Sequence, residues 1–212
     1  MSECKLNVIL DLDNTIINAI ETRDKIKVPL NTGLDYFDWP PMFKIYARPH
    51  LQEFLDFLFA NFNVSVFTAA DKDYAIDIVR NFIYKDHPER QLTIFFYRYH
   101  VEKSHSEYKG VKDLRILWDL FKVPGFYPCN TVIIDDLDMV AKTNSFNCIP
   151  IKAFHVVDDN GNYNPDSVND TDLLRVKAKL QTVKQLYDTT VCSFYGYFTS
   201  GQDKQKPLLK IA

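Results

Sequence analysis

The 212-residue chain contains no long hydrophobic run. No apolar stretch approaches the ~20 residues that a membrane-spanning helix needs. The N-terminus, MSECKLNVILDLDNT, also lacks the basic segment and the longer apolar segment of a secretory leader. We therefore expect no membrane association and an intracellular location, cytoplasmic or nuclear.

Cysteine is scarce and scattered. The four cysteines lie far apart, with no CxxC pair and no histidine at zinc-ligand spacing; they are Cys4, Cys129, Cys148 and Cys192. This pattern excludes a structural zinc site of the usual spacing and a disulfide framework. We expect reduced thiols.

An excess of positive charge is also missing. The chain has 25 Lys and Arg against 28 Asp and Glu, which gives a formal net charge of -3. A general nucleic-acid binder usually shows a basic stripe or patch, so this balance argues against direct nucleic-acid binding. Any anionic ligand must be held by local groups.

The chain does contain short apolar runs that alternate with amphipathic segments, a pattern typical of a parallel sheet with helices on both faces. The predicted strands are Asn7–Leu10, Val64–Phe67, Thr131–Ile134 and Cys148–Ile151. The predicted helices are residues 49–62, 71–83, 110–121 and Thr171–Tyr187. Tyr74, Ile78 and Phe82 form the apolar face of the second helix. The fold class is therefore α/β, a three-layer Rossmann-like parallel sheet.

Two segments interrupt this alternation. Residues 16–45 are too long for a simple loop and are expected to form a flap, and residues 84–110 are expected to form an insertion. We predict a single domain over residues 1–190 with an inserted lobe, followed by a C-terminal tail over residues 191–212.

Polar residues follow the predicted strands at the points where parallel strands of an open sheet meet a ligand. They are Asp11, Asp13, Thr68, Asp135 and Asp136, with Lys112 at the start of a predicted helix. Clustered carboxylates raise one another's pKa or require a cation, and hard oxygen ligands suit Mg²⁺, which commonly accompanies phosphate. The pattern predicts a magnesium-phosphate site.

Each element also has a simpler explanation. Asp11 and Asp13 alone fit solvated turn acids, Thr68 alone fits a β-branched strand residue, and Asp135 with Asp136 fits either interpretation. Lys112 is more informative, because a cation in the first turn of a helix opposes the macrodipole unless an anion lies there. Taken together, the residues favour a phosphate site over coincidence.

The order DLDNT, VFTAA, VKD, VIIDD resembles the haloacid-dehalogenase (HAD) superfamily of aspartate-nucleophile phosphatases. The spans KIYARPHLQEFL, VSVFTAADKDYA and VIIDDLDMVAKTNSFNCIPIKAF resemble the branch of the RNA polymerase II carboxy-terminal-domain phosphatases and the nuclear LIM interactor-interacting-factor-like phosphatases. The resemblance covers roughly residues 6–174 and implies a HAD-like fold.

The resemblance also implies catalytic roles. Asp11 would be the nucleophile, and Asp13 would act as general acid and then as general base. Thr68 and Lys112 would hold the phosphoryl oxygens, while Asp135 orients Lys112.

It implies a metal site and a substrate site as well. Mg²⁺ would be bound by the Asp11 carboxylate, the Asp13 backbone carbonyl and the Asp136 side chain. Thr15 would fix the motif loop, and Thr15, Ala69 and Arg98 are the candidate substrate-binding residues. For Arg98, and also for His105, solvated surface is the favoured alternative.

Three departures from the branch pattern stand out. The usual DNSP reads Asp135, Asp136, Leu137, Asp138 here, so an acid replaces a neutral metal ligand. Asn14 stands where the branch often has Glu. Residues 84–110 match only loosely, which leaves substrate specificity open.

Together these features predict a Mg²⁺-dependent phosphatase of phosphoserine or phosphothreonine in proteins, with an aspartyl-phosphate intermediate. The polymerase tail is one candidate substrate. The alternatives are a non-catalytic scaffold of the same fold, or a phosphatase of nucleic-acid ends or a small metabolite. A receiver domain is rejected because Thr68 and Lys112 precede the second acid pair. The aromatic cluster from Tyr36 to Pro41 is expected to pack within the core or lobe, with contact to a proline-containing phosphopeptide as the alternative.

Overall fold

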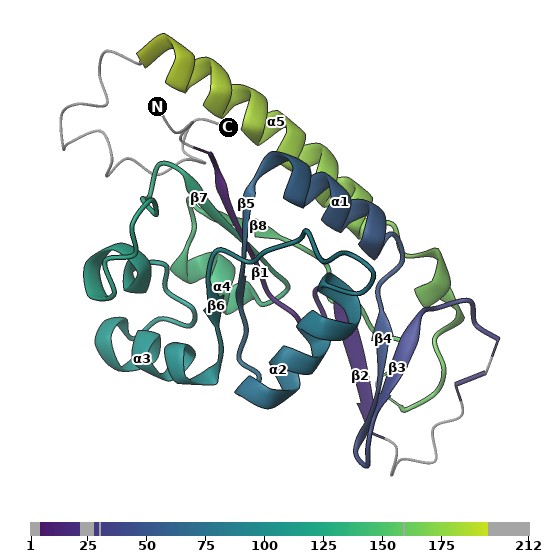
Figure 1. Ribbon diagram of the computed structural model, residues 1–212. Helices are drawn as coiled ribbons and strands as arrows, with labels where there is room; N and C mark the ends of the chain where they lie inside the picture. Colours follow the sequence, from purple (N-terminus) through teal and green to yellow (C-terminus); the bar gives the residue numbers. More distant parts are fainter. Residues whose placement is uncertain (1–4, 22–27, 30, 159, 195–212) are drawn as a thin grey trace.

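The computed structural model describes residues 5–21, 28–29, 31–158 and 160–194, with side chains described to residue 189 (Figure 1). Its centre is a five-stranded parallel sheet in the order β6-β5-β1-β7-β8. The strands are β1 (Asn7–Leu10), β5 (Asn63–Phe67), β6 (Phe95–Phe96), β7 (Thr131–Asp135) and β8 (Cys148–Pro150). The α/β class and the parallel central sheet are confirmed.

Side chains of the sheet alternate between two hydrophobic layers, as the pleat of a strand requires. On one face, Val8 and Leu10 of β1 pack with the helices α1 (Leu51–Asn61), α2 (Lys72–Ile78) and α5 (Asp172–Phe194). On the other face, Ile9 packs with Leu117 of η2 (Ile116–Leu120) and Val140 of α4 (Asp138–Thr143). The three layers expected from the sequence are therefore present.

The flap expected over residues 16–45 is a small antiparallel sheet in the order β2-β4-β3. Its strands are β2 (Ile17–Glu21), β3 (Tyr36–Trp39) and β4 (Phe43–Ala47). Phe37 and Trp39 turn toward the main core, with the Phe37 ring 5.2 Å from the Phe82 ring and the Trp39 ring 5.4 Å from the Tyr74 ring. Phe37 and Trp39 of this aromatic cluster therefore pack against the core, whereas Tyr36, Pro40 and Pro41 are exposed. Residues 22–27 and 30 lie outside the described part of the chain.

The segment over residues 84–110 differs from the expected insertion. It supplies β6, the edge strand of the main sheet, and α3 (Arg98–Tyr108). The sequence pattern did not predict these two elements, because β6 is only two residues long and α3 buries little apolar surface. The segment continues the parallel sheet.

The helix expected over residues 110–121 is shorter than its pattern suggested. Regular helical structure is confined to the π-helical turn η2, and Lys112 precedes it in a turn with φ 48°. The prediction that Lys112 lies in the first turn of a helix is therefore wrong, and the macrodipole argument built on it does not apply. The turn has this conformation because its backbone is hydrogen-bonded to Ser104 of α3 and to Asn144, which follows α4.

The remaining boundaries differ from expectation by a few residues. The second expected helix runs through α2 and continues as the π-helical segment η1 (Val79–Ile83), while η3 (Pro165–Asn169) precedes α5. The last helix extends past the predicted domain end, to Phe194, and the expected tail beyond it lies outside the described residues. Among the described residues, none of the helices is long and apolar enough to cross a bilayer.

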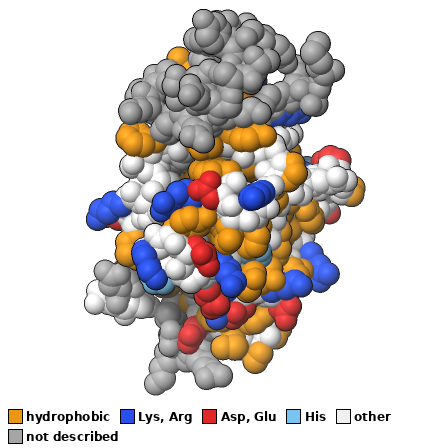
Figure 2. Space-filling view, turned by 90° about the vertical axis from the view of Figure 1, so that its left-hand side faces the viewer, with side chains coloured by type: hydrophobic (Ala, Val, Ile, Leu, Met, Phe, Trp, Pro, Cys, Tyr) orange, Lys and Arg blue, Asp and Glu red, His pale blue; other side chains and the backbone are white. Residues whose placement is uncertain are grey.

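The face shown in Figure 2 carries acidic, basic and hydrophobic side chains interspersed with one another. Such mixing is ordinary for a globular surface. It agrees with the near-balanced charge of the whole chain.

Candidate active site

The predicted site residues converge at the carboxyl ends of the three central strands. Leu10 pairs with Val66 on one side and with Ile134 on the other, so the residues that follow these strands lie at one edge of the sheet. Those residues are Asp11, Thr68, Asp135 and Asp136. The register explains why acids far apart in the sequence become neighbours.

Lys112 reaches into the centre of this edge. Its Nζ donates to Asp11 Oδ1 at 2.5 Å and to Asp135 Oδ2 at 2.7 Å. The exposed fractions are 1% for Lys112, 4% for Asp11 and 0% for Asp135. Burial acts to lower the pKa of Lys112, but the adjacent charges of Asp11 and Asp135 outweigh it and raise that pKa. The lysine therefore stays charged between two buried carboxylates.

Thr15 connects the two acid pairs. Its Oγ1 lies 3.2 Å from Asp11 Oδ2 and 3.1 Å from Asp136 Oδ1. A hydroxyl has a single proton, so it donates to one of these carboxylates at a time. The other close approach is favourable only if the second carboxyl is protonated or a cation lies beside it. Thr15 thus ties the loop after β1 to the carboxylates of Asp11 and Asp136.

The same acids form a possible metal site. One carboxylate oxygen from each of Asp11, Asp135 and Asp136 lies within 4.8 Å of the others. Burial, followed by the charge of Asp11, raises the pKa of Asp135 and that of Asp136. Raised carboxyl pKa values mean that Lys112 alone does not neutralise the cluster, and oxygen donors of this kind fit Mg²⁺. The residues present therefore suit a hard divalent cation.

Asp13 lies next to this cluster in a different environment. Burial and then the charge of Asp11 raise its pKa to about 6. Its Oδ1 accepts a hydrogen bond of 2.8 Å from the hydroxyl of Tyr74 in α2. A half-buried carboxyl with a pKa near neutrality is suited to both giving and taking a proton.

Three further predicted residues lie just after β5 and at the start of α3. Thr68 is fully buried, and its Oγ1 accepts from the backbone N–H of Ala70 at 3.1 Å. Ala69 is exposed, and its carbonyl accepts from Arg98 Nε at 3.3 Å. Arg98 also pairs with Asp71 at 2.9 Å. Arg98 therefore lies at the rim beside Ala69, and its contact with substrate stays a prediction.

The turn that carries Lys112 is held from two sides. Asn144, at the end of α4, accepts from the Leu114 N–H at 3.0 Å and donates to the Lys112 carbonyl at 3.1 Å. Ser104 of α3 accepts from the Asp113 N–H at 2.7 Å and donates to the Gly110 carbonyl at 3.0 Å. These contacts account for the left-handed backbone at Lys112, and no local feature of the sequence predicts them.

Two other supporting residues escaped the sequence analysis. Arg48 is buried and donates to Asp170 through Nε and Nη2, at 2.7 and 2.8 Å, and to the Thr15 carbonyl at 2.9 Å. Tyr74 was assigned to an apolar helix face, which its ring occupies while its hydroxyl reaches Asp13. For Arg48, the signal was its place in the quoted segment KIYARPHLQEFL.

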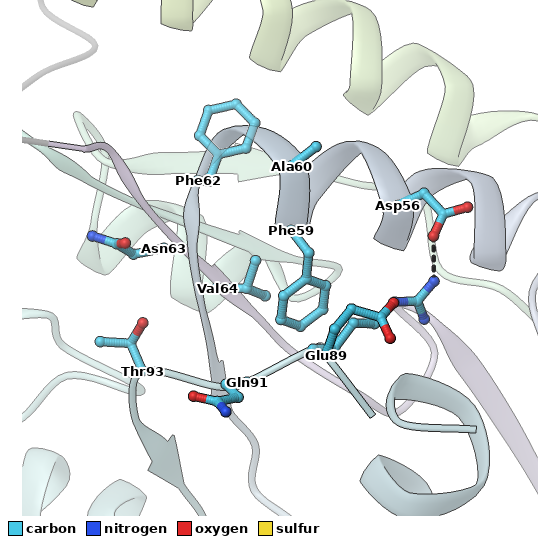
Figure 3. A pocket seen from close by; sticks show the side chains of 10 residues that line it. Asp56, Phe59, Ala60, Phe62, Asn63, Val64, Glu89, Gln91 and Thr93 are labelled. Atoms are coloured by element: carbon cyan, nitrogen blue, oxygen red, sulfur yellow. Dashed lines mark hydrogen bonds and ion pairs between the residues drawn. The ribbon is translucent and has the colours of Figure 1, made fainter. Parts of the chain in front are cut away.

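A hollow of about 410 Å³ lies elsewhere, around the start of β5 (Figure 3). Phe59, Phe62 and Val64 line it, and an ion pair of 2.6 Å joins Arg90 to Asp56 at its margin. Val64 lies near the amino end of β5, whereas Thr68 follows the carboxyl end. The hollow is therefore separate from the acid cluster.

The chain is similar to known proteins over most of its length. The family model of the NLI interacting factor-like phosphatases matches residues 6–190. The CTD phosphatase-like protein 355R of Invertebrate iridescent virus 3 is 38% identical over 193 residues, covering 84% of this chain and 96% of the relative. Its counterpart in Invertebrate iridescent virus 6 is 37% identical over 181 residues, covering 82% and 96%.

A solved structure shares the fold. The RNA polymerase II CTD phosphatase Fcp1 superposes with a TM-score of 0.64 at 18% identity, over 99% of this chain and 70% of that one. At this identity the likeness supports the HAD-like fold alone.

Proposed function

The chain belongs to the NLI interacting factor-like phosphatase family, and we propose that it is a Mg²⁺-dependent protein phosphatase that hydrolyses phosphoserine or phosphothreonine through an aspartyl phosphate. The observation that carries this proposal is the contact of Lys112 with both Asp11 and Asp135 beside Asp136 and Thr15. A buried cation within an acid cluster of this kind is suited to neutralising a phosphoryl group while a carboxylate attacks it.

In the proposed first step, a carboxylate oxygen of Asp11 attacks phosphorus. The bond from phosphorus to the serine or threonine oxygen breaks, its electron pair stays on that oxygen, and the oxygen takes a proton from Asp13. Thr68 and Lys112 hold the phosphoryl oxygens, and Asp135 keeps Lys112 in place. The dephosphorylated side chain then leaves.

In the second step, water attacks phosphorus and gives a proton to Asp13. The bond between phosphorus and Asp11 breaks, which regenerates the carboxylate and releases inorganic phosphate. Asp13 thereby returns to its starting protonation state. Its pKa of about 6 suits both directions of transfer.

The Asp11 and Asp136 carboxylates and the Asp13 backbone carbonyl would hold Mg²⁺. When bound, the ion supplies charge neutralisation and orientation for the phosphoryl oxygens. Asp135 belongs to the same acid cluster, but its Oδ2 accepts from Lys112, which supports an orienting role.

The test is hydrolysis of a small phosphate ester with and without Mg²⁺ by wild type, Asp11→Asn and Asp13→Asn. We expect loss of turnover in both variants, and loss in wild type after chelation. Asp119→Asn, at an exposed position on η2, is the matched control and should keep wild-type turnover. Equal turnover in all four proteins would contradict the mechanism.

The intermediate is tested by rapid quenching and intact-mass measurement. Wild type or Asp13→Asn mixed with 2,4-dinitrophenyl phosphate, whose leaving group needs no proton, should gain the mass of one phosphoryl group, and Asp11→Asn should gain none. A phosphoryl group found on a residue other than Asp11 would reject this residue as the nucleophile.

Substrate class requires a panel. The names of the viral relatives and of Fcp1 support including phosphorylated polymerase-tail repeats among phosphoserine and phosphothreonine peptides. We expect hydrolysis of phosphopeptides at higher kcat/KM than of nucleotides or sugar phosphates. The reverse order would favour a metabolite phosphatase, and no turnover on any of them would favour a scaffold.

A further inference from the structure

Tyr74 connects the flap to the acid that the proposed function requires. Its hydroxyl donates to Asp13 Oδ1 at 2.8 Å, across 61 positions of sequence. We propose that Tyr74 is a positioning residue, which fixes the orientation of the Asp13 carboxyl so that its other oxygen, Oδ2, carries the proton to and from the substrate. This inference rests on the proposed function and adds a residue to it.

The chemistry of the two groups supports this assignment. A phenol is protonated at neutral pH and donates one hydrogen bond, and the carboxyl oxygen that receives this bond acts as acceptor. The proton of a neutral Asp13 then lies on Oδ2. Without Tyr74, a carboxyl can rotate and place its proton on either oxygen, so only part of the population would be ready to react.

The ring of Tyr74 is itself fixed by the flap. The Trp39 ring of β3 lies 5.4 Å from it at an interplanar angle of 87°, and the Phe43 ring of β4 lies 6.1 Å from it at 66°. Edge-on arrangements of this kind are favourable for aromatic pairs. Trp39 in turn donates from Nε1 to Asp77 Oδ2 at 2.9 Å. Asp77 and Tyr74 both belong to α2, so one hydrogen bond and two ring contacts tie the flap to this helix.

A purely structural role for Tyr74 makes a different prediction. If the residue only fills space between the flap and α2, removing its hydroxyl should affect every substrate equally. If it positions the acid, the effect should depend on how much the leaving oxygen needs a proton. A serine oxygen leaves slowly unless it is protonated, whereas dinitrophenolate leaves without a proton.

The experiment compares kcat/KM for a phosphoserine peptide and for 2,4-dinitrophenyl phosphate in wild type and in Tyr74→Phe. We expect a loss of about tenfold to a hundredfold on the peptide, below the range for removal of a general acid, and a loss under about threefold on the aryl ester. Asp13→Asn should show the same selectivity with a larger loss on the peptide.

Controls separate positioning from stability. Tyr84→Phe removes a hydroxyl that accepts from the Leu92 N–H at 3.1 Å, and it should leave both rates unchanged. Trp39→Phe keeps an aromatic ring but loses the bond to Asp77, and it should give a smaller loss with the same preference for the peptide. Thermal unfolding of each variant verifies that it is folded at the assay temperature.

Two outcomes overturn the inference alone. If Asp13→Asn is selective for the leaving group while Tyr74→Phe loses both activities equally, or loses neither, Tyr74 does not position the acid. Absence of hydrolysis by wild type on both substrates would instead overturn the proposed function on which the inference rests.

Discussion

Arg48 supports the loop that follows β1 from within the core. Its guanidinium makes a two-point contact with Asp170 and a third bond to the Thr15 carbonyl. The side chain is fully buried, whereas that of Asp170 is 16% exposed. A paired guanidinium of this geometry satisfies several polar groups at once, so its removal leaves both a buried carbonyl and a carboxylate without that partner.

We expect Arg48→Met to lower the free energy of unfolding by about 3–5 kcal/mol, the usual cost of breaking a buried pair from one side. Urea denaturation measures this. Arg80→Met is the matched control, because the Arg80 side chain is 72% exposed and forms a surface ion pair of 3.7 Å with Asp77. Its substitution should lower the free energy of unfolding by less than about 0.5 kcal/mol. Similar losses in the two variants would contradict the role given to Arg48.

The acid cluster predicts that Mg²⁺ stabilises the protein. In its absence, carboxyls with raised pKa values destabilise the folded state at pH values above those pKa values, because the ionised carboxylates are less favourable in the folded protein than in the unfolded chain. Bound cation relieves this repulsion, and at one hundred times its dissociation constant it adds about 2.7 kcal/mol. We expect saturating Mg²⁺ to raise Tm at pH 7.5.

The sign of the pH dependence follows from the same carboxyls. As pH falls, protons compete with the cation for Asp136, a proposed ligand whose pKa is raised. Protonation of Asp13, with a pKa of about 6, also reduces the repulsion between carboxylates in the metal-free protein. The Tm increase from Mg²⁺ should therefore be smaller at pH 5 than at pH 7.5. Asp136→Asn should reduce the increase at pH 7.5, while Asp119→Asn should not. An increase independent of both pH and Asp136 would locate the cation elsewhere.

At the scale of elements, Lys112 belongs to a turn rather than to a helix. Gly110, at the start of this turn, lies so close to α4 that a Cβ would be 2.6 Å from Thr143 Cγ2. The backbone of the turn therefore approaches α4 more closely than another residue allows without a shift. Together with the bonds from Asn144 and Ser104, this contact fixes where the Lys112 ammonium lies.

We expect Asn144→Ala to lower the free energy of unfolding by about 1–3 kcal/mol, since the buried Leu114 N–H loses its acceptor. It should also lower kcat on small esters, because Lys112 would no longer be held against Asp11. Asn61→Ala removes a bond within α1 only, to the Phe57 carbonyl, and should leave kcat unchanged. A stable and fully active Asn144→Ala protein would show that the turn keeps its conformation without Asn144.

The sequence predicted the elements whose signals are local. Contiguous apolar runs such as NVIL and TVII marked the central strands, and the acids directly after them marked the site edge. The conformation at Lys112 was missed because Asn144, 32 positions away, determines it. The contact of Tyr74 with Asp13 was missed because helical spacing predicts that the ring lies in the core but does not predict which group its hydroxyl contacts.

At the scale of the whole molecule, the long helix α5 closes the core over one face of the sheet, beside α1 (Figure 1). Its buried side chains recur every three or four positions, as an amphipathic helix requires. They are Leu173, Val176, Leu180, Val183 and Tyr187. The active-site edge and this helix therefore share one hydrophobic core, which also contains Val8 and Leu10 of β1.

We expect Leu180→Ala to lower the free energy of unfolding by about 2–5 kcal/mol through the cavity it leaves. The rate per folded molecule should stay near wild type, because Leu180 contacts the core and not the acids. Gln181→Ala, next to it on the exposed side of α5, should change stability by less than about 0.5 kcal/mol. Chemical denaturation and activity assays on the same samples distinguish the two effects.

The central position of β1 has a consequence for motion. This strand is bonded to β5 on one side and β7 on the other, and the Asp11 N–H itself donates to the Ile134 carbonyl at 3.1 Å. Amide hydrogens in such a strand exchange with deuterated solvent only when the whole domain opens. Local fluctuations of the flap or of the Lys112 turn can therefore change the surroundings of the proposed phosphate site, while Asp11, the proposed nucleophile, stays anchored to a strand whose amides exchange slowly.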